Sequence, residues 1–395
     1  MKGLFSGEGE RPLRAARLAV LAVFFLNGFG FASFVVRIPA VQERLALGEG
    51  LLGLALLGVS LGSLPSMPLT GWLVSRFGSR PVVGISALLF PLALSVAALA
   101  PGLPTLVSAL VLVGASAGLL DVSMNAHAST VEKGYERRIM SSFHAAFSFG
   151  GLAGAASGGL VASAGIGVAL HVLGVAALSA VAAALVYGSL LPAGADRGEA
   201  GAPAFARPTR ALVGLGVISF CVLLGEGAMA DWSAVYLSND LRTGPGFAAA
   251  GYAAFSLTMA TGRLFGDRLA DALGPATLVR LGGTIAAAGL AFGLLVATPA
   301  AALLGFAGVG LGLSVIFPTA LGAAGRAEGG TGPAIAAVST AGYFGFLVGP
   351  PTIGFLAEAT RLGVALFLVV VLSVAVAVLA GAVGRGAGRK KGASR

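Results

Sequence analysis

Residues 211–237, ALVGLGVISFCVLLGEGAMADWSAVYL, form the kind of apolar run that crosses a lipid bilayer. A helix needs about 20 predominantly apolar residues to span roughly 30 Å of hydrocarbon. Runs of this length recur along the chain, which is 57% hydrophobic and only 10% charged, whereas an ordinary soluble domain is about a quarter charged. The 62 glycines suit a membrane protein, because small residues let helix backbones approach closely. The sequence therefore predicts an all-α integral membrane protein.

Twelve apolar runs predict twelve transmembrane helices in two sets of six. The first set is expected at 14–37, 51–74, 82–100, 105–128, 139–163 and 167–190, and the second at 211–237, 247–265, 276–297, 300–324, 333–357 and 362–384. If both termini are cytoplasmic, all but four of the 25 Lys and Arg residues fall inside; the exceptions are Arg37, Arg44, Arg242 and Arg361. Cytoplasmic segments carry an excess of Lys and Arg. We therefore expect an N-in/C-in protein of the inner (plasma) membrane, with a basic surplus that reflects topology and not nucleic-acid binding.

The chain divides into two similar halves. We expect an N-terminal six-helix bundle (1–190), a Gly-, Pro- and Ala-rich cytoplasmic linker (191–210), a C-terminal bundle (211–384) and a basic tail (385–395). Glycines of the first half recur in the second at an offset close to half the chain: Gly28 and Gly30 match Gly225 and Gly227, and Gly150 and Gly154 match Gly345 and Gly349. Such repeats support alternating access, with substrate bound near the midplane between the halves. We expect a monomer, and the single cysteine, Cys221, excludes an internal disulfide.

The segment GWLVSRFGSR, residues 71–80, resembles the signature G-x-L-a-D-R-x-G-R-R of the major facilitator superfamily, between spans 2 and 3. The matching positions are Gly71, Leu73, Arg76, Gly78 and Arg80, whereas Ser75 replaces the usual Asp. The second copy, 266–276, retains an acid at Asp271. The resemblance implies a twelve-helix transporter in which these residues belong to a cytoplasmic gate, and the glycines are expected to permit the tight turn between spans.

Two further segments resemble the fucose/glucose proton symporter group and its bacterial relatives. These are RIPAVQERL (37–45) and RRIMSSFHAAFSFGGLAGA (137–155). In that group span 4 carries a protonatable acid and span 5 a polar residue facing the sugar, and Asp121 and His144 occupy comparable positions here. The group also has an acid in span 1, where this chain has Asn27. The resemblance implies uptake of a sugar or similar polar solute together with protons.

Ionisable residues inside a membrane are costly and usually functional. We predict Asp121 and Glu226 as the proton-coupling residues. On span 4, Gly114, Gly118, Asp121 and Asn125 share one helical face, which is expected to line a cavity. The predicted substrate-binding residues are Asn27, Asn125, His144, Trp232 and Tyr343. The alternatives are an ion pair of Asp121 with Arg76 or Arg80, an interhelical hydrogen bond for His144, and a place in the aromatic belt for Trp232.

Glu226 and Asp231 need separate explanations. Five residues rotate a helix by about 500°, which leaves the two acids roughly 140° apart. We predict that Asp231 pairs with Arg37 of span 1 and forms an outer gate between the halves.

The predicted function is proton-coupled uptake of a small polar solute, with protons as the coupling ion and no other cofactor. The sequence has no P-loop, no zinc-ligand cluster and no nucleophile–His–acid pattern, so an enzyme is not expected. The alternative is a proton-coupled exporter of drugs or metabolites. For that class, Gly150-x3-Gly154-Ala155-x2-Gly158-Gly159 is similar to the antiporter signature of span 5, with Ala155 in place of Pro, although ordinary helix packing also explains these glycines.

Overall fold

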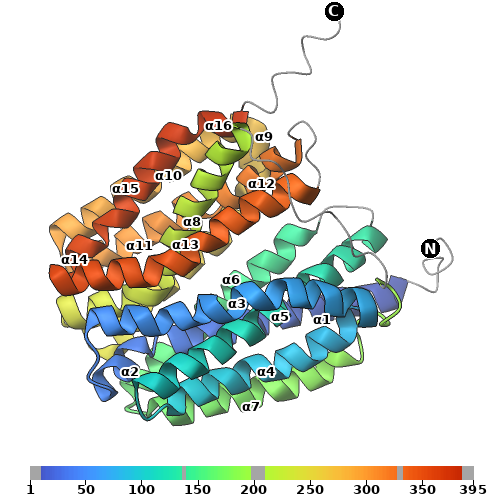
Figure 1. The fold of residues 1–395 in the computed structure, drawn as a ribbon, viewed down its shortest axis with the longest axis horizontal. Coiled ribbons are helices and arrows are strands. Elements are labelled where there is room, and N and C mark those ends of the chain that lie inside the picture. The colour runs from blue at the N-terminus through green and yellow to red at the C-terminus, as the bar shows by residue number, and fades with distance from the viewer. Residues whose placement is uncertain (1–9, 136–138, 197–209, 327–331, 385–395) are drawn as a thin grey trace, which may run out of the picture. The chain divides into compact units, whose positions relative to one another are not determined.

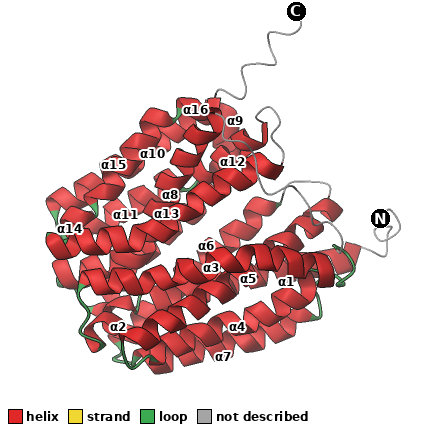
Figure 2. Ribbon diagram, viewed as in Figure 1, coloured by secondary structure: helices red, strands yellow, loops and turns green. Residues whose placement is uncertain are grey.

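A computed structural model describes residues 10–135, 139–196, 210–326 and 332–384. Helices are the only regular structure in these ranges (Figure 2). By its contacts the chain forms two compact units: unit 1 comprises Met1–Ala46 and Ala55–Ala200, and unit 2 comprises Leu47–Leu54 and Gly201–Arg395.

In the described residues of the first half of the chain (Figure 1), the helices are α1 (Glu10–Val35), α2 (Ile38–Arg44), α3 (Glu49–Phe77), α4 (Ser79–Leu99), α5 (Leu103–Tyr135), α6 (Met140–Ser163) and α7 (Val168–Tyr187). The second half holds α8 (Arg210–Val235), the π-helical turn η3 (Tyr236–Asp240), α9 (Pro245–Leu273), α10 (Pro275–Val296), α11 (Pro299–Leu313), α12 (Ile316–Arg326), α13 (Gly332–Ala359), α14 (Leu362–Ala365), α15 (Phe367–Leu379) and α16 (Gly381–Gly384).

Eleven helical segments within the described ranges are long and apolar enough to cross a membrane. The run expected at 247–265 is helical, as α9, but is not among the eleven. The second half of α9 carries Arg263, Asp267, Arg268 and Asp271, and these charged residues make the helix less apolar. Large apolar side chains such as Leu185 (77% exposed) and Leu295 (74% exposed) lie on the outside of their units. Exposed apolar residues of this size suit a lipid environment, so the protein is a multi-pass membrane protein.

The two units repeat the same internal packing. Helix α1 packs on α6, α4 on α5 and α4 on α7 in unit 1, and in unit 2 α8 packs on α13, α10 on α11 and α10 on α15. Two of the glycine pairs that match in sequence, Gly150/Gly345 and Gly154/Gly349, lie at the α1–α6 and α8–α13 contacts. A Cβ on Gly150 would collide with the carbonyl oxygen of Phe25 on α1, and one on Gly345 would collide with the carbonyl oxygen of Phe220 on α8. Small residues are therefore required at equivalent helix crossings.

A left-handed glycine separates two long helices in each unit. Gly78 (φ 84°) precedes α4, and Gly274 (φ 77°) precedes α10. Side chains rarely adopt this conformation, so glycine is the residue that permits the turn. Gly71 does not contribute to the turn, contrary to our expectation. It lies inside α3, and nothing lies within 4 Å of the position of its missing Cβ.

Candidate functional site

Unit 1 brings several predicted polar residues to neighbouring turns of α1 and α5. Asn27 is buried, and its Nδ2 donates to Sδ of Met124 at 3.7 Å. Asn125 Nδ2 donates to the backbone oxygen of Asp121 at 2.8 Å and to its Oδ1 at 3.0 Å. The carboxylate of Asp121 therefore has an amide partner on its own helix. This group therefore holds one carboxylate and two amide side chains. Asn27 is buried, and Asp121 and Asn125 are half-buried.

Arg76 and Arg80 make contacts of a different kind from the ion pair considered for Asp121. The Arg76 guanidinium lies over the rings of Trp72 and Phe77, at 5.9 and 5.8 Å. The Arg80 guanidinium lies 4.8 Å from the ring centroid of Tyr187, and Nη2 donates to the Tyr187 carbonyl at 3.3 Å. Both arginines are thus held by aromatic side chains.

His144 lies on α6 beside the aromatic side chains of the same unit. Its ring meets that of Phe24 edge to face, with centroids 5.4 Å apart, and Phe24 also stacks on Phe143 at 5.7 Å. The imidazole is half-buried, whereas Phe143 is fully buried. Contact with Phe24 fixes the ring and leaves it partly accessible, which is compatible with the predicted binding role.

The glycines of α5 do not line a cavity, and this corrects the expectation for the Gly114–Asn125 face. A Cβ on Gly114 would collide with the carbonyl oxygen of Val59, and one on Gly118 would collide with Oγ of Ser66. Both glycines therefore let α5 approach α3 closely. Only Asp121 and Asn125 of that face remain as candidates for polar function.

A small cavity of about 10 Å³ adjoins Asn27. It is lined by Val23, Leu26, Asn27, Ala87, Phe90, Pro91, Leu120 and Ser179. A volume of this size holds about one water molecule. The buried Oγ of Ser179, which also lines this cavity, has no hydrogen-bond partner among the described residues.

In unit 2, Glu226 of α8 pairs with Arg263 of α9. Arg263 Nη2 lies 3.5 Å from Glu226 Oε2, and the two side chains are only 19% and 16% exposed. Sequence reasoning counted Arg263 with the cytoplasmic residues, but α9 continues as one helix to Leu273. Arg263 therefore lies about 15 Å before the end of that helix. The feature of the sequence that could have indicated this pair is Arg263 itself, since it lies within the span expected at 247–265.

Asp231 of α8 shares one neighbour, Tyr252 of α9, with Glu226 and Arg263. Tyr252 of α9 hydrogen bonds to Ser256 and lies within electrostatic range of Glu226, Arg263 and Asp231. The two acids therefore act on a common neighbour although they lie on different faces of α8. Sequence reasoning missed Tyr252, because nothing in the order of residues shows which face of α9 meets α8.

The two predicted aromatic binding residues differ in accessibility. Trp232 is fully buried, and its Nε1 has no hydrogen-bond partner among the described residues, so it does not lie in an aromatic belt. Tyr343 on α13 is half-buried, with its ring 6.3 Å from that of Phe346. A substrate reaches Tyr343 more easily than Trp232. Both roles stay predictions.

Arg37 is buried in the turn between α1 and α2. Its Nη2 donates to the Ile166 carbonyl at 2.7 Å, whereas Nε and Nη1 have no hydrogen-bond partner among the described residues. His171 of α7 is also buried, and both ring nitrogens lack a partner in the described parts of the chain. Arg37 belongs to unit 1 and Asp231 to unit 2, and their pairing stays a prediction.

The residues after α7 pack onto the signature segment. The Ser79 amide donates to both carboxylate oxygens of Asp196, at 3.1 and 3.3 Å. Ser79 Oγ lies 2.6 Å from Nδ1 of His127, and the Leu191 amide donates to Nε2 of His127 at 3.1 Å. Asp196 thus places an acid at the start of α4, although Ser75 occupies the usual acidic position. The first residues of the predicted linker lie against unit 1, and 197–209 lie outside the described residues. Asp271 is exposed on α9.

Comparison with known proteins identifies the class of membrane protein to which this architecture of apolar helices and intramembrane polar groups belongs, a membrane transporter. Residues 20–332 match the sequence profile of the Major Facilitator Superfamily. An uncharacterised MFS-type transporter of Yersinia pestis is 36% identical over 386 residues, covering 96% of this chain and 98% of that protein. The chain therefore belongs to the Major Facilitator Superfamily. Its family and relatives are transporters and not enzymes.

Solved structures with the same fold include two proton symporters. The D-xylose–proton symporter has a TM-score of 0.72 at 17% identity, covering 93% of this chain and 96% of that one. The fucose:proton symporter of E. coli has a TM-score of 0.62 at 16% identity, covering 92% and 97%. At these identities the likeness establishes the fold alone.

Proposed function

We propose that this transporter couples proton movement to the uptake of a small polar solute, a sugar or sugar derivative, by alternating access. In this proposal α9 is the eighth of twelve spans, both termini are cytoplasmic, and a monomer works in the inner membrane. The distribution of Lys and Arg supports that orientation. Arg37 and Asp231 would close the outer side.

The observation that carries the proposal is the pair formed by Glu226 and Arg263. A proton on Glu226 neutralises the carboxylate and removes its attraction for the guanidinium. Loading and release of a proton would therefore break and remake the contact between α8 and α9. Ionisable residues within membrane helices commonly serve such proton relays.

The polar residues of unit 1 support a polar substrate. Asn27, Asn125 and His144 offer amide and imidazole groups, which suit hydroxyl groups, and Asp121 adds a carboxylate. The glycines of α6 that resemble the antiporter signature support packing instead. Gly154 lies against the backbone of Phe29 on α1, and Gly158 lies against the Val36 side chain.

The test uses proteoliposomes that contain a pH dye, with sugars and sugar acids added outside. We expect acidification of the lumen with at least one compound. Flux should be lost in Asp121→Asn or Glu226→Gln and retained in Glu43→Gln, which removes an exposed carboxylate on α2. Lumen alkalinisation on addition of a lipophilic cation, without a sugar response, would instead establish the exporter.

A further inference from the structure

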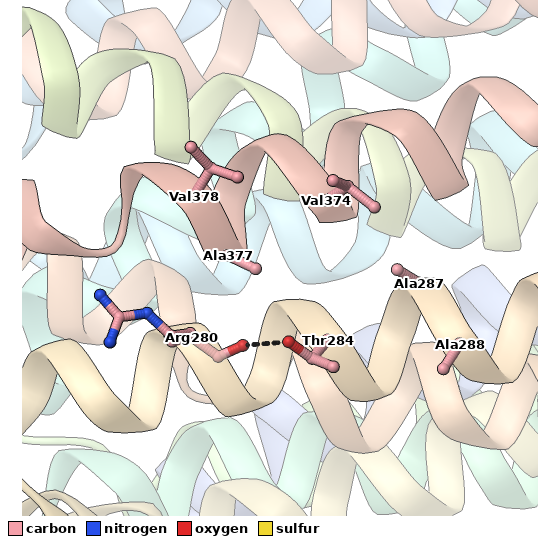
Figure 3. A pocket seen from close by; sticks show the side chains of 7 residues that line it. All are labelled: Arg280, Thr284, Ala287, Ala288, Val374, Ala377 and Val378. Carbon is pink, nitrogen blue, oxygen red and sulfur yellow. Dashed lines mark hydrogen bonds between the residues drawn. The ribbon is translucent and has the colours of Figure 1, made fainter.

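A groove on unit 2 lies between α10 and α15 and has a volume of about 430 Å³. Its lining residues are Arg280, Thr284, Ala287, Ala288, Val374, Ala377 and Val378 (Figure 3). This volume lies within the range of about 300–1,000 Å³ that is usual for small-molecule sites. From Arg280 to Ala288 the groove follows α10 for about 12 Å.

Helix packing shapes this groove. A Cβ on Gly283 would lie 2.8 Å from the Ser373 carbonyl oxygen and 2.9 Å from the Ala377 amide nitrogen, so α10 and α15 touch there at backbone distance. The lining side chains beside this contact are short. Ala377 of α15 and Ala287 of α10 project into the space between the helices (Figure 3). Val374 (48% exposed) and Val378 (74% exposed) are open to the surroundings of the protein.

The polar character of the groove is confined to one end. Thr284 Oγ1 donates to the Arg280 backbone oxygen at 2.9 Å, so its hydroxyl is already satisfied within α10 (Figure 3). Arg280 is exposed, and no ion pair of its side chain is found within the described ranges. The remaining five lining residues are Ala or Val. The groove therefore offers one cation followed by an apolar channel.

We propose that the α10–α15 groove binds one anionic phospholipid, with its phosphate at Arg280 and an acyl chain along Ala287, Ala288 and Val374. The multi-pass membrane character of the protein places this open face in lipid, and an exposed guanidinium complements a phosphate. Basic pockets between transmembrane helices bind anionic headgroups in this way. Arg280 lies near the start of α10, where a long side chain extends to the headgroup region. The site is independent of the proposed proton coupling.

Native mass spectrometry of the full chain tests this proposal. Delipidated protein in detergent is titrated with phosphatidylglycerol, or with phosphatidylcholine of the same acyl chains, and the first bound lipid is quantified. We expect phosphatidylglycerol to bind at least fivefold more tightly. Arg280→Gln should weaken it about fivefold, because one basic residue near the surface contributes about 1 kcal/mol. Phosphatidylcholine binding should change little.

Two matched controls separate this site from general lipid binding. Arg242→Gln removes an exposed arginine from the loop that precedes α9, and it should not change the binding of phosphatidylglycerol. Ala288→Phe fills the groove and should prevent the first binding event for both lipids, whereas Leu295→Phe, on the same helix outside the groove, should not. Ala288 is exposed, so the added ring does not displace core residues. Equal effects of Arg280→Gln and Arg242→Gln, or unchanged binding in Ala288→Phe, would overturn the proposal.

Discussion

Arg263 Nη2 lies 3.5 Å from Glu226 Oε2, which joins α9 to α8 by opposite charges that are mostly buried. Removal of one partner of such a pair leaves the other charge uncompensated. This usually lowers the free energy of unfolding by about 3 kcal/mol or more. We predict that Arg263→Gln and Glu226→Gln each lower the apparent Tm in detergent. Glu226→Gln should have the larger effect, because Arg263 then keeps its charge without the Glu226 carboxylate, whereas Glu226 can take up a proton and become neutral when the arginine is removed.

The double variant Glu226→Gln/Arg263→Gln should recover much of this loss, because two neutral amides can hydrogen bond to each other. A double-mutant cycle on the apparent Tm measures the coupling. If the two single effects simply add, the pair does not contribute to stability.

Gly28 should tolerate no larger side chain. A Cβ there would collide with the carbonyl oxygen of Phe147 on α6. Gly28→Ala is expected to destabilise the protein by about 1–3 kcal/mol, the usual range for overpacking. The measurement is thermal unfolding of the purified protein.

Gly174→Ala is the matched control. Nothing lies within 4 Å of the missing Cβ of this glycine, which is inside α7. Alanine is favoured over glycine in a helix interior by roughly 0.5–1 kcal/mol, so this variant should be neutral or slightly more stable. Similar losses in both variants would show that the collision with Phe147 at the α1–α6 contact is not the cause of the destabilisation.

The two glycines of the signature segment should respond in opposite ways. Gly78 has φ 84°, and its Cβ would collide with the Ala193 carbonyl oxygen, so Gly78→Ala should lower stability by about 1–3 kcal/mol. Gly71→Ala meets open space inside α3 and should be tolerated. Thermal unfolding and the yield of folded protein distinguish the two. A destabilised Gly71→Ala would restore a structural role for that position.

Asp196 should stabilise the start of α4. Its carboxylate accepts from the Ser79 amide, as a helix N-cap side chain does. We predict that Asp196→Ala lowers the free energy of unfolding by about 1 kcal/mol, whereas Asp196→Asn retains most of it, because an amide oxygen still accepts the bond. Limited proteolysis between α7 and α8 provides the readout. Equal cleavage of wild type and Asp196→Ala would contradict this anchoring role.

His127 completes the same contact. Because Nε2 accepts from the Leu191 amide, a neutral ring carries its proton on Nδ1 and donates it to Ser79 Oγ. His127 is only 2% exposed. The packing of residues 191–196 against α4 and α5 covers it. No local pattern predicts that contact, because its partners are separated by 48 and 64 residues.

The sequence alone determined the all-helical membrane architecture, because bilayer thickness requires apolar runs of a set length and backbone groups in lipid must be satisfied within helices. It also identified Asp121 and Glu226 as intramembrane acids, since a charge within an apolar run is conspicuous. Only the tertiary structure decided their neighbours. Asn125 hydrogen bonds to Asp121 within one helix, but Arg263 pairs with Glu226 because a particular face of α9 packs on α8. That face is selected by side-chain packing over the whole unit, which no local period of the sequence encodes.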